Sequence, residues 1–183
     1  QIGLVEAIEP DPPEGVEPLV WRILTTLPTK TAEDAREVIR LYRLRWRIEE
    51  VFRALKSDGM ALEDTQVQEA ERLFHLSALA LGAAVRTIQL VDARKGGSRP
   101  MSDVLDETFA DAVALLVRAK ERPTAKQTNP HPERSLAWLS WVVARYGGWN
   151  CYGKPPGPKT MARGWQRFAA TLTGVILAKA ELL

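Results

Sequence analysis

The sequence predicts a mixed α/β protein in which helices predominate. Two short segments near the N-terminus are rich in apolar and β-branched residues and end at proline-containing turns, which is typical of strands. Two long segments follow in which apolar residues recur at helical spacing. Beyond residues 95–100, shorter helical patterns alternate with loops rich in proline and glycine, so we expect a small helical domain at the C-terminal end.

The two predicted strands lie within the first 30 residues. Residues 2–8 alternate loosely between apolar and polar side chains and end at a turn over residues 10–15. Residues 19–27 (LVWRILTTL) are apolar and β-branched and stop at Pro28, which predicts a second, largely buried strand.

Two long helices are expected next. Thr31 is a suitable N-cap, Asp34 occupies the capping-box position, and Gly59 is a suitable stop, so we expect one helix over residues 31–57. A second helix is expected over residues 65–94, and the small residues in its middle indicate close packing against another helix.

The segment KGGSRP at residues 95–100 is the best domain boundary, dividing the chain into domains 1–95 and 96–183. In the second domain, helices are expected over residues 103–121, 133–146 and 160–182, the last broken or bent near Gly174. Five aromatic residues there form either a small core or part of an exposed partner surface: Trp138, Trp141, Trp149, Trp165 and Phe168.

Composition excludes several classes of protein. With 183 residues, 45% hydrophobic and 26% charged, the chain has the composition of a soluble globular protein. The longest apolar run without charge, residues 73–85, is too short for a membrane span, so we expect no membrane partner. The single cysteine, Cys151, excludes an internal disulfide and a thiolate zinc cluster. The first residue is not Met, which suggests a piece of a longer protein.

The net charge of +2 conceals a strong segregation of charge. Residues 1–35 carry two basic and seven acidic side chains, whereas residues 36–56 carry seven basic and three acidic ones. Residues 57–121 are again acidic, with seven basic against eleven acidic side chains, and residues 122–183 hold nine basic and two acidic ones. Two basic blocks in a nearly neutral chain suggest a polyanionic partner contacted at two places.

A helix over residues 31–57 would have three faces. An arc of about 100° gathers an expected core face: Leu41, Leu44, Ile48, Val51, Phe52 and Leu55. An adjacent arc gathers one aromatic residue, one carboxylate and three cations: Tyr42, Arg45, Glu49, Arg53 and Lys56. We call this second set the cationic stripe. The remaining face is expected to point to solvent and includes Arg43, Arg47 and Glu50.

Spacing alone leaves two interpretations of the cationic stripe open. Glu49 lies four residues from both Arg45 and Arg53, and such pairs stabilise a helix on their own. Alternatively, the stripe is a phosphate-handling site. Its cations would hold backbone phosphates, Tyr42 would stack on a sugar or base, and Glu49 would hold Mg²⁺.

A family resemblance favours the second interpretation. The residues Tyr42-x2-Arg45-x3-Glu49-x6-Lys56, within YRLRWRIEEVFRALKSDG, resemble the Tyr-(2)-Arg-(3)-Glu-(6)-Lys signature of bacterial insertion-sequence DDE transposases. All four positions match. The strand containing Trp21 and the C-terminal GGWNCYGKPPGPKT segment are also similar to the family, so the resemblance covers most of the chain.

The resemblance implies a role for each site residue. Glu49 would be the third carboxylate of the catalytic triad and a ligand of Mg²⁺, with Mn²⁺ as a substitute. Tyr42, Arg45 and Lys56 would grip phosphates at the transposon end and help to hold a flipped base, and Arg53 would add a phosphate contact. Trp21 would stack in the gap left by the extruded base, although packing in a buried strand is the alternative for this indole.

The implied fold is only partly present. Residues 1–95 would be the C-terminal part of an RNase H-like core, about two strands plus two long helices, including strands of an inserted β segment. The two aspartates that a DDE enzyme needs are missing, because the only aspartates before Glu49 are Asp11, in a turn, and Asp34, at a helix start. We therefore expect the C-terminal fragment of a cut-and-paste transposase, inactive alone and binding metal only in the full-length enzyme with DNA.

The resemblance also implies the partners. These are the double-stranded DNA ends of a transposon and a second copy of the protein, contacted through residues 96–183, without a small-molecule cofactor. The expected location is the bacterial cytoplasm, on the nucleoid during activity. Two other classes stay open: a truncated transposase that dimerises and inhibits the full-length protein, and a helical regulator unrelated to transposition.

Overall fold

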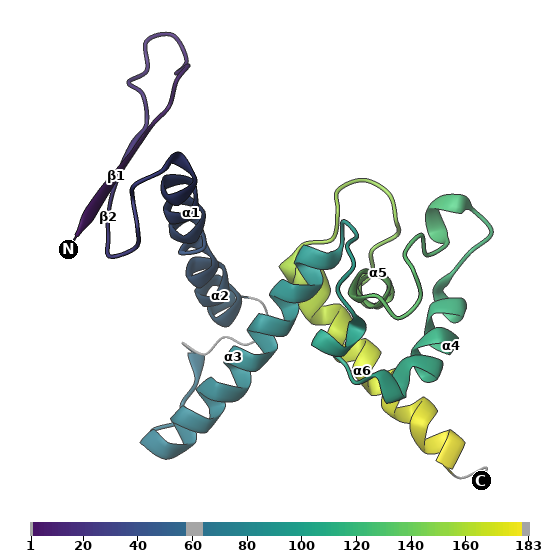
Figure 1. The fold of residues 1–183 in the computed structure, drawn as a ribbon. Coiled ribbons are helices and arrows are strands. Elements are labelled where there is room, and N and C mark those ends of the chain that lie inside the picture. The colour runs from purple at the N-terminus through teal and green to yellow at the C-terminus, as the bar shows by residue number, and fades with distance from the viewer. Residues whose placement is uncertain (1, 58–63, 181–183) are drawn as a thin grey trace. The chain divides into compact units, whose positions relative to one another are not determined.

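The computed structural model describes residues 2–57 and 64–180, and these are mostly helical with one two-stranded sheet (Figure 1). This confirms the mixed α/β prediction with helices predominating. The chain divides into two compact units, Gln1–Glu50 and Val51–Leu183, which are described separately.

The first unit contains a β-hairpin covered by a helix. Strands β1 (Gly3–Ile8) and β2 (Val20–Thr25) are antiparallel, with Gly3 opposite Thr25 and Ile8 opposite Val20. Because side chains alternate between the two faces of a sheet, one face presents Val5 and Ile23. Both are buried against Val38 of helix α1 (Ala32–Arg43), and they form the small core of this unit.

The opposite face of the hairpin is exposed. Leu4 and Leu24 face each other across the ladder with 59% and 73% exposed area, and Ile8 and Val20 are exposed as well. The prediction that residues 19–27 form a largely buried strand is therefore wrong. Within the described part of this unit, α1 covers only one face of the sheet, so only alternate residues of β2 are buried.

Helix α1 begins as predicted. The Thr31 hydroxyl accepts a hydrogen bond from the Asp34 amide at 3.1 Å, and the Asp34 carboxylate accepts from the Thr31 amide at 3.0 Å, which completes a capping box. The same carboxylate accepts from the Lys30 amide at 2.9 Å. These backbone donors lower the pKa of Asp34, chiefly through the Thr31 amide.

The predicted continuous helix over residues 31–57 is interrupted. Helix α1 ends at Arg43, and α2 runs over Trp46–Ser57. Between them the Arg45 amide donates to the Tyr42 carbonyl, and the Arg47 amide to the Leu44 carbonyl, each three residues back. These tighter turns break the 3.6-residue period. The interruption contains neither glycine nor proline, so the residue pattern does not announce it.

The expected core face of that helix is also wrong. Leu41, Leu44, Ile48 and Phe52 are 38–56% exposed, and Val51 and Leu55 are half-buried. In α1 the sheet is contacted instead by Val38, with Ala35 and Ile39 packed beside it. The predicted core face was derived for one continuous helix, whereas the backbone leaves the helical period at residues 44 and 45.

Besides the end of α2, the described part of the second unit contains four helices. These are α3 (Ala70–Ala93), α4 (Ala110–Lys120), α5 (Leu136–Tyr146) and α6 (Pro158–Ala180), with short 3₁₀ turns η2 (Met101–Asp103), η3 (Glu107–Phe109) and η4 (Ala125–Gln127). Helix α5 is central, because every residue from Leu136 to Ala144 is buried. The Ser140 hydroxyl within it donates to the Leu90 carbonyl of α3 at 2.7 Å.

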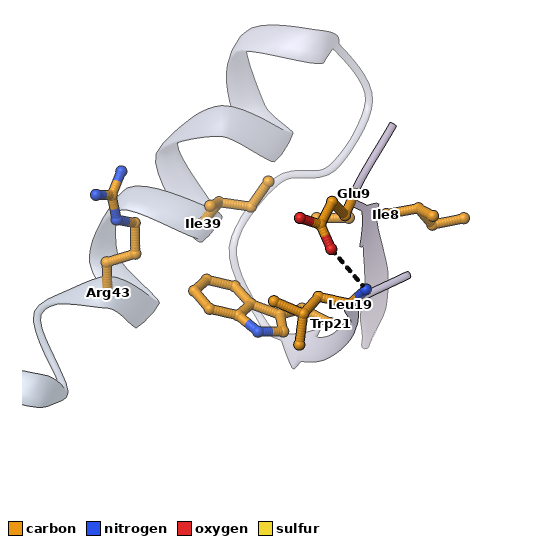
Figure 2. A pocket seen from close by; sticks show the side chains of 7 residues that line it. Ile8, Glu9, Leu19, Trp21, Ile39 and Arg43 are labelled. Carbon is orange, nitrogen blue, oxygen red and sulfur yellow. Dashed lines mark hydrogen bonds between the residues drawn. The ribbon is translucent and has the colours of Figure 1, made fainter. Parts of the chain in front are cut away.

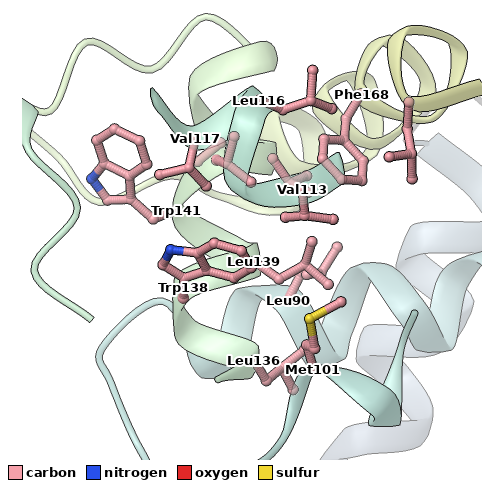
Figure 3. Close-up of a cluster of buried hydrophobic side chains, with 14 of the residues drawn as sticks. Leu90, Met101, Val113, Leu116, Val117, Leu136, Trp138, Leu139, Trp141 and Phe168 are labelled. Carbon is pink, nitrogen blue, oxygen red and sulfur yellow. The ribbon is translucent and has the colours of Figure 1, made fainter. Parts of the chain in front are cut away.

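The core of the second unit gathers buried side chains from all four helices, as Figure 3 shows around Trp138, Leu139 and Phe168. Trp138, Trp141 and Phe168 are buried, while Trp149 and Trp165 pack partly buried against them. Of the two alternatives left open for these aromatic residues, the small domain core is confirmed.

Two outcomes in this unit differ from expectation. Helix α6 runs without a break through Gly174. The two compact units meet between Glu50 and Val51, inside α2, whereas the loop at residues 95–100 lies within the second unit. The reason is that α3 packs against α5 and α6, so the helix before that loop shares a core with those after it.

Helix α3 is long and apolar enough to cross a membrane by length and composition alone. The length argument used above to exclude a span therefore does not hold for this helix. Such helices also occur in the cores of soluble proteins, and the C-terminal half of α3 contributes Ala84, Leu90 and Ala93 to the buried residues. The expectation of no membrane partner stays a prediction.

Candidate nucleic-acid interface

Trp21 and Tyr42 meet in the first unit. Trp21 lies on the face of β2 that packs toward α1, and Tyr42 lies in the last turn of α1. Their ring centroids are 5.4 Å apart at an interplanar angle of 69°, an edge-to-face contact. Trp21 is half-buried and Tyr42 is 38% exposed, so these rings form a partly solvent-facing aromatic pair.

A hollow of about 410 Å³ opens beside the Trp21 indole. Figure 2 shows the indole between the hairpin and the helix, with Ile39 and Arg43 on the helix side. The Glu9 carboxylate at its edge accepts a hydrogen bond from the Leu19 amide at 3.2 Å. The hollow therefore combines an aromatic wall, aliphatic side chains and one guanidinium from α1.

Arg45 lies at the interruption between α1 and α2 and contacts both the Tyr42 ring and the Glu49 carboxylate. Its guanidinium lies 5.8 Å from the Tyr42 ring centroid and 5.4 Å from that of Trp46. Its Nη1 also donates to Glu49 Oε1 at 3.1 Å. Arg45 thus stays beside two aromatic rings while paired with the acid.

Glu49 faces solvent and not an apolar core. Its side chain is 41% exposed and that of Arg45 is 49% exposed, so water screens the pair and its contribution to stability is small. Glu49 sits in the first turn of α2, where the helix dipole favours a negative charge. The adjacent Glu50 forms a separate ion pair with Arg47 at 2.8 Å.

Not all members of the cationic stripe come together in one unit. Tyr42, Arg45 and Glu49 belong to the first unit, with Trp21 beside them. Arg53 and Lys56 follow on α2, both exposed, beyond the boundary between the two units. The spacing thus correctly predicted the Arg45–Glu49 pair, whereas the stripe is carried by two helices instead of one.

Two members of the interface were missed by sequence reasoning. Arg43 was assigned to the solvent face but lines the hollow beside Trp21, and Trp46 was given no role but lies against the Arg45 guanidinium. Arg43 lies one helical turn after Ile39, which lines the same hollow, so a four-residue spacing from this apolar position could have placed it on that face. The contact of Trp46 with Arg45 has no such signal.

The described residues hold no group of three or more His, Cys, Asp or Glu side chains that could bind a metal ion. Glu49 therefore does not belong to a cluster of three or more such groups in this part of the chain. Mg²⁺ commonly binds proteins through one or two carboxylates together with substrate phosphates. Glu49 would supply one half-exposed carboxylate, and the neighbouring cations would attract the phosphate, so the residues present fit part of this donor set.

Residues 5–86 match the family model of the transposase DDE domain. The match covers 82 of the 183 residues and includes β1 from Val5 onward, β2, α1, α2 and every member of the interface described above. It supports a DDE transposase, a family of DNA-processing enzymes that generally use divalent metal ions.

Proposed function

We propose that this chain is the C-terminal part of a cut-and-paste DDE transposase and that the first unit and α2 hold the transposon end. One observation carries the proposal. Trp21 and Tyr42, which are distant in sequence, form an aromatic pair next to the Arg45–Glu49 ion pair, inside the segment that matches the transposase model.

The cations of the stripe would position phosphates of double-stranded DNA. Arg45, Arg53 and Lys56 are exposed, and a guanidinium offers forked donors that match phosphate geometry. The Tyr42 hydroxyl would donate to the same backbone. In the transition state these cations would offset charge that develops on the phosphate oxygens.

Trp21 would receive an unstacked base. Its indole borders a hollow with aliphatic walls and is only half-buried, so one side of the ring is accessible to a planar ligand. Stacking of a base on an aromatic side chain contributes about 1–3 kcal/mol. Arg43, on the same hollow, would hold the adjoining phosphate.

Glu49 would serve as the third catalytic carboxylate. The chemistry that bound Mg²⁺ or Mn²⁺ supplies is activation of water, and later of the freed 3′-hydroxyl, toward a phosphodiester. Before DNA arrives, Arg45 holds the Glu49 carboxylate. A phosphate would compete for Arg45 and leave Glu49 oxygens available as metal ligands. The two aspartates needed with Glu49 would lie in polypeptide outside this chain, so the chain alone would not cleave DNA.

The second unit would bring two copies together in the DNA complex. It has its own core, with Trp138, Trp141 and Phe168 buried, and thus can present a stable surface independent of the first unit. We place the full-length enzyme in the bacterial cytoplasm, on the nucleoid when it acts.

A second function is favoured by one observation. The part of the chain described holds a folded helical unit and a cationic stripe but no cluster of three acids. A chain of this kind made alone would bind DNA and pair with the full-length enzyme without cleaving, and so inhibit it. Two strand-borne aspartates encoded in frame upstream would identify the catalytic role, and an initiation codon directly before the Gln1 codon would identify the inhibitory one.

DNA binding by this chain is the first test. Affinity for duplex DNA is expected to be weak and to fall steeply with salt, because phosphate contacts release counterions. Arg45→Gln is expected to lower the slope of log affinity against log salt by about 0.9, the loss of one phosphate contact. Arg36→Gln is the matched control, since Arg36 is an exposed arginine of α1 paired with Glu33. An affinity insensitive to salt would contradict phosphate gripping.

A further inference from the structure

The second unit contains a cavity of about 440 Å³ that the proposed function does not use. One side is formed by α5, through Ser140, Trp141 and Ala144. The others come from Arg94 at the end of α3 and from two loops around η4 and residues 149–156. Its size is that of small-molecule sites, which range from about 300 to 1,000 Å³.

The ionisable side chains that line this cavity are basic. Arg94, Lys95 and Lys126 carry positive charge, and burial lowers the pKa of His131. His131 is therefore neutral at pH 7 and has a ring nitrogen able to accept or donate. Among the described lining residues there is no Asp or Glu. The electrostatics favour an anion.

Two residues that line this cavity carry buried donors without partners. In the described part of the chain, three buried side-chain atoms lack a hydrogen-bond partner: Arg94 Nε, Arg145 Nε and Trp149 Nε1. Arg94 and Trp149 line the cavity, whereas Arg145 does not. The Arg145 guanidinium is 5.7 Å from the Trp141 ring and donates to the Trp149 backbone carbonyl at 3.0 Å. The two orphaned atoms on lining residues, Arg94 Nε and Trp149 Nε1, are N–H groups, and a ligand rich in acceptors would satisfy them.

The remaining walls suit a flat apolar ring. Trp141 and Trp149 provide indole surfaces, and Pro130, Pro155 and Pro156 provide aliphatic ones. At the rim the Lys126 ammonium lies 5.5 Å from the Tyr152 ring, so a cation sits next to a further aromatic side chain. Aromatic surfaces with adjacent cations are the combination that holds a base and its phosphate.

We propose that this cavity binds a nucleotide, with the base between the indole walls and the phosphate at Arg94, Lys95 and Lys126. The nucleotide is either a free nucleoside monophosphate or an unpaired nucleotide of a DNA strand. The site lies wholly within the second unit, so the proposal does not depend on the function assigned to Trp21 and Glu49.

The test follows the indole N–H resonances of the whole 183-residue chain while dAMP is added. The Trp149 resonance is expected to shift strongly, because its N–H gains an acceptor, and the His131 ring is expected to titrate at higher pH beside the phosphate. Inorganic phosphate and benzoate are added separately. An equal response to phosphate alone, an equal response to benzoate, or no response to dAMP overturns the proposal.

Variants identify the contacts. The double variant Lys95→Gln/Lys126→Gln removes two exposed cations and is expected to weaken dAMP binding about tenfold or more. Lys159→Gln/Lys179→Gln, with both lysines in α6 and outside the cavity lining, removes the same number of charges and is expected to leave binding unchanged. Trp149→Phe keeps an aromatic wall without the donor and should also weaken binding. Unchanged affinity in both test variants overturns the proposal.

A short single-stranded oligonucleotide distinguishes the two possible sources of the nucleotide. If the oligonucleotide displaces bound dAMP at a lower concentration than a free nucleotide does, the ligand is a DNA strand. Binding of dAMP without competition by the oligonucleotide identifies a free nucleotide. Both results support the proposed chemistry of the cavity.

Discussion

We assign Trp21 two roles, one in folding and one in binding. Its indole packs at the edge of the hairpin core and against Tyr42, and the same ring borders the hollow offered to a base. A ring in such a position contributes both to folding and to binding. The two contributions can be separated only by a variant that keeps the packing.

Substitution of Trp21 separates them. Trp21→Phe is expected to keep the unit folded and to weaken DNA binding modestly, since a smaller ring still stacks. Trp21→Ala is expected to lose about 1–3 kcal/mol of binding free energy for an unstacked base. Affinity for a duplex with one unpaired base measures the loss, and thermal unfolding checks the fold. Trp165→Phe, in the other unit, serves as control, and wild-type affinity in a folded Trp21→Ala variant would contradict base stacking.

The contacts of single residues also show how much of the site could be predicted from the sequence. The Arg45–Glu49 contact was predictable, because a four-residue spacing joins side chains on neighbouring turns. The contact of Trp46 with Arg45 was not, since it lies where the backbone departs from the helical period, whereas Arg43 lies one turn after Ile39 on the same hollow and was assigned to the wrong face. The contact between Trp21 and Tyr42 joins two elements, and no local pattern encodes it.

At the scale of elements, the start of α1 was predictable and its end was not. Thr31 and Asp34 satisfy the first amides of the helix, a local arrangement that their side chains determine. The interruption at residues 44–45 has no residue that forces it. The buried face was therefore assigned to the wrong side chains.

The capping box of α1 is expected to stabilise the first unit. Thr31→Ala is expected to cost about 0.5–2 kcal/mol of stability, the usual contribution of an N-cap side chain. Thermal unfolding followed by circular dichroism measures it, with the exposed Thr26→Ala as control. An unchanged melting temperature would mean that the cap is not formed in solution.

Asp34 gives the cap a pH dependence. Its pKa is lowered on folding, so its contribution is fully present above the unfolded value near 3.8 and is lost as the pH falls through the lower folded value. The stability difference between wild type and Asp34→Ala should therefore be constant at neutral pH and shrink in acid. A difference that grows below pH 4 would contradict this sign.

Helix α6 approaches α5 closely at a glycine. A Cβ added to Gly164 would clash with the Val143 carbonyl oxygen, whereas one added to Gly174 would meet nothing. Gly164→Ala is thus expected to destabilise the second unit by about 1–3 kcal/mol through overpacking. Gly174→Ala, in the same helix, should stabilise it by up to about 1 kcal/mol through helix propensity. Equal effects in chemical denaturation would contradict the close approach.

At the scale of the whole molecule, the helical predominance could be predicted, because long periodic segments are strong signals, whereas the division of residues 31–57 into two helices could not. The division into units could not be predicted. The loop at residues 95–100 has the composition of a linker, yet α3 before it shares a core with α5 and α6 after it. The sequence left open whether the aromatic residues of the second unit form a core or part of a partner surface, and the cavity beside Trp141 and Trp149 depends on loops whose course no pattern specifies.

Basic side chains occur at both proposed phosphate sites. The first basic block contains the cationic stripe, whereas the cavity of the helical unit takes Lys126 from the second block and Arg94 and Lys95 from the acidic segment 57–121. We propose that both sites bind phosphates, one on a duplex end and the other on a single nucleotide. An acid surrounded by cations in the first block is the feature on which the assignment to transposition depends.

The most direct measurement is strand cleavage by the full-length transposase carrying Glu49→Gln, assayed with Mg²⁺ and with Mn²⁺ on its own transposon-end duplex. Cleavage is expected to disappear while DNA binding stays within about twofold, because glutamine keeps the shape and removes the charge that holds the metal. Glu50→Gln, one position along and paired with Arg47, is expected to retain cleavage. Cleavage at wild-type rate by Glu49→Gln would place the third catalytic carboxylate elsewhere.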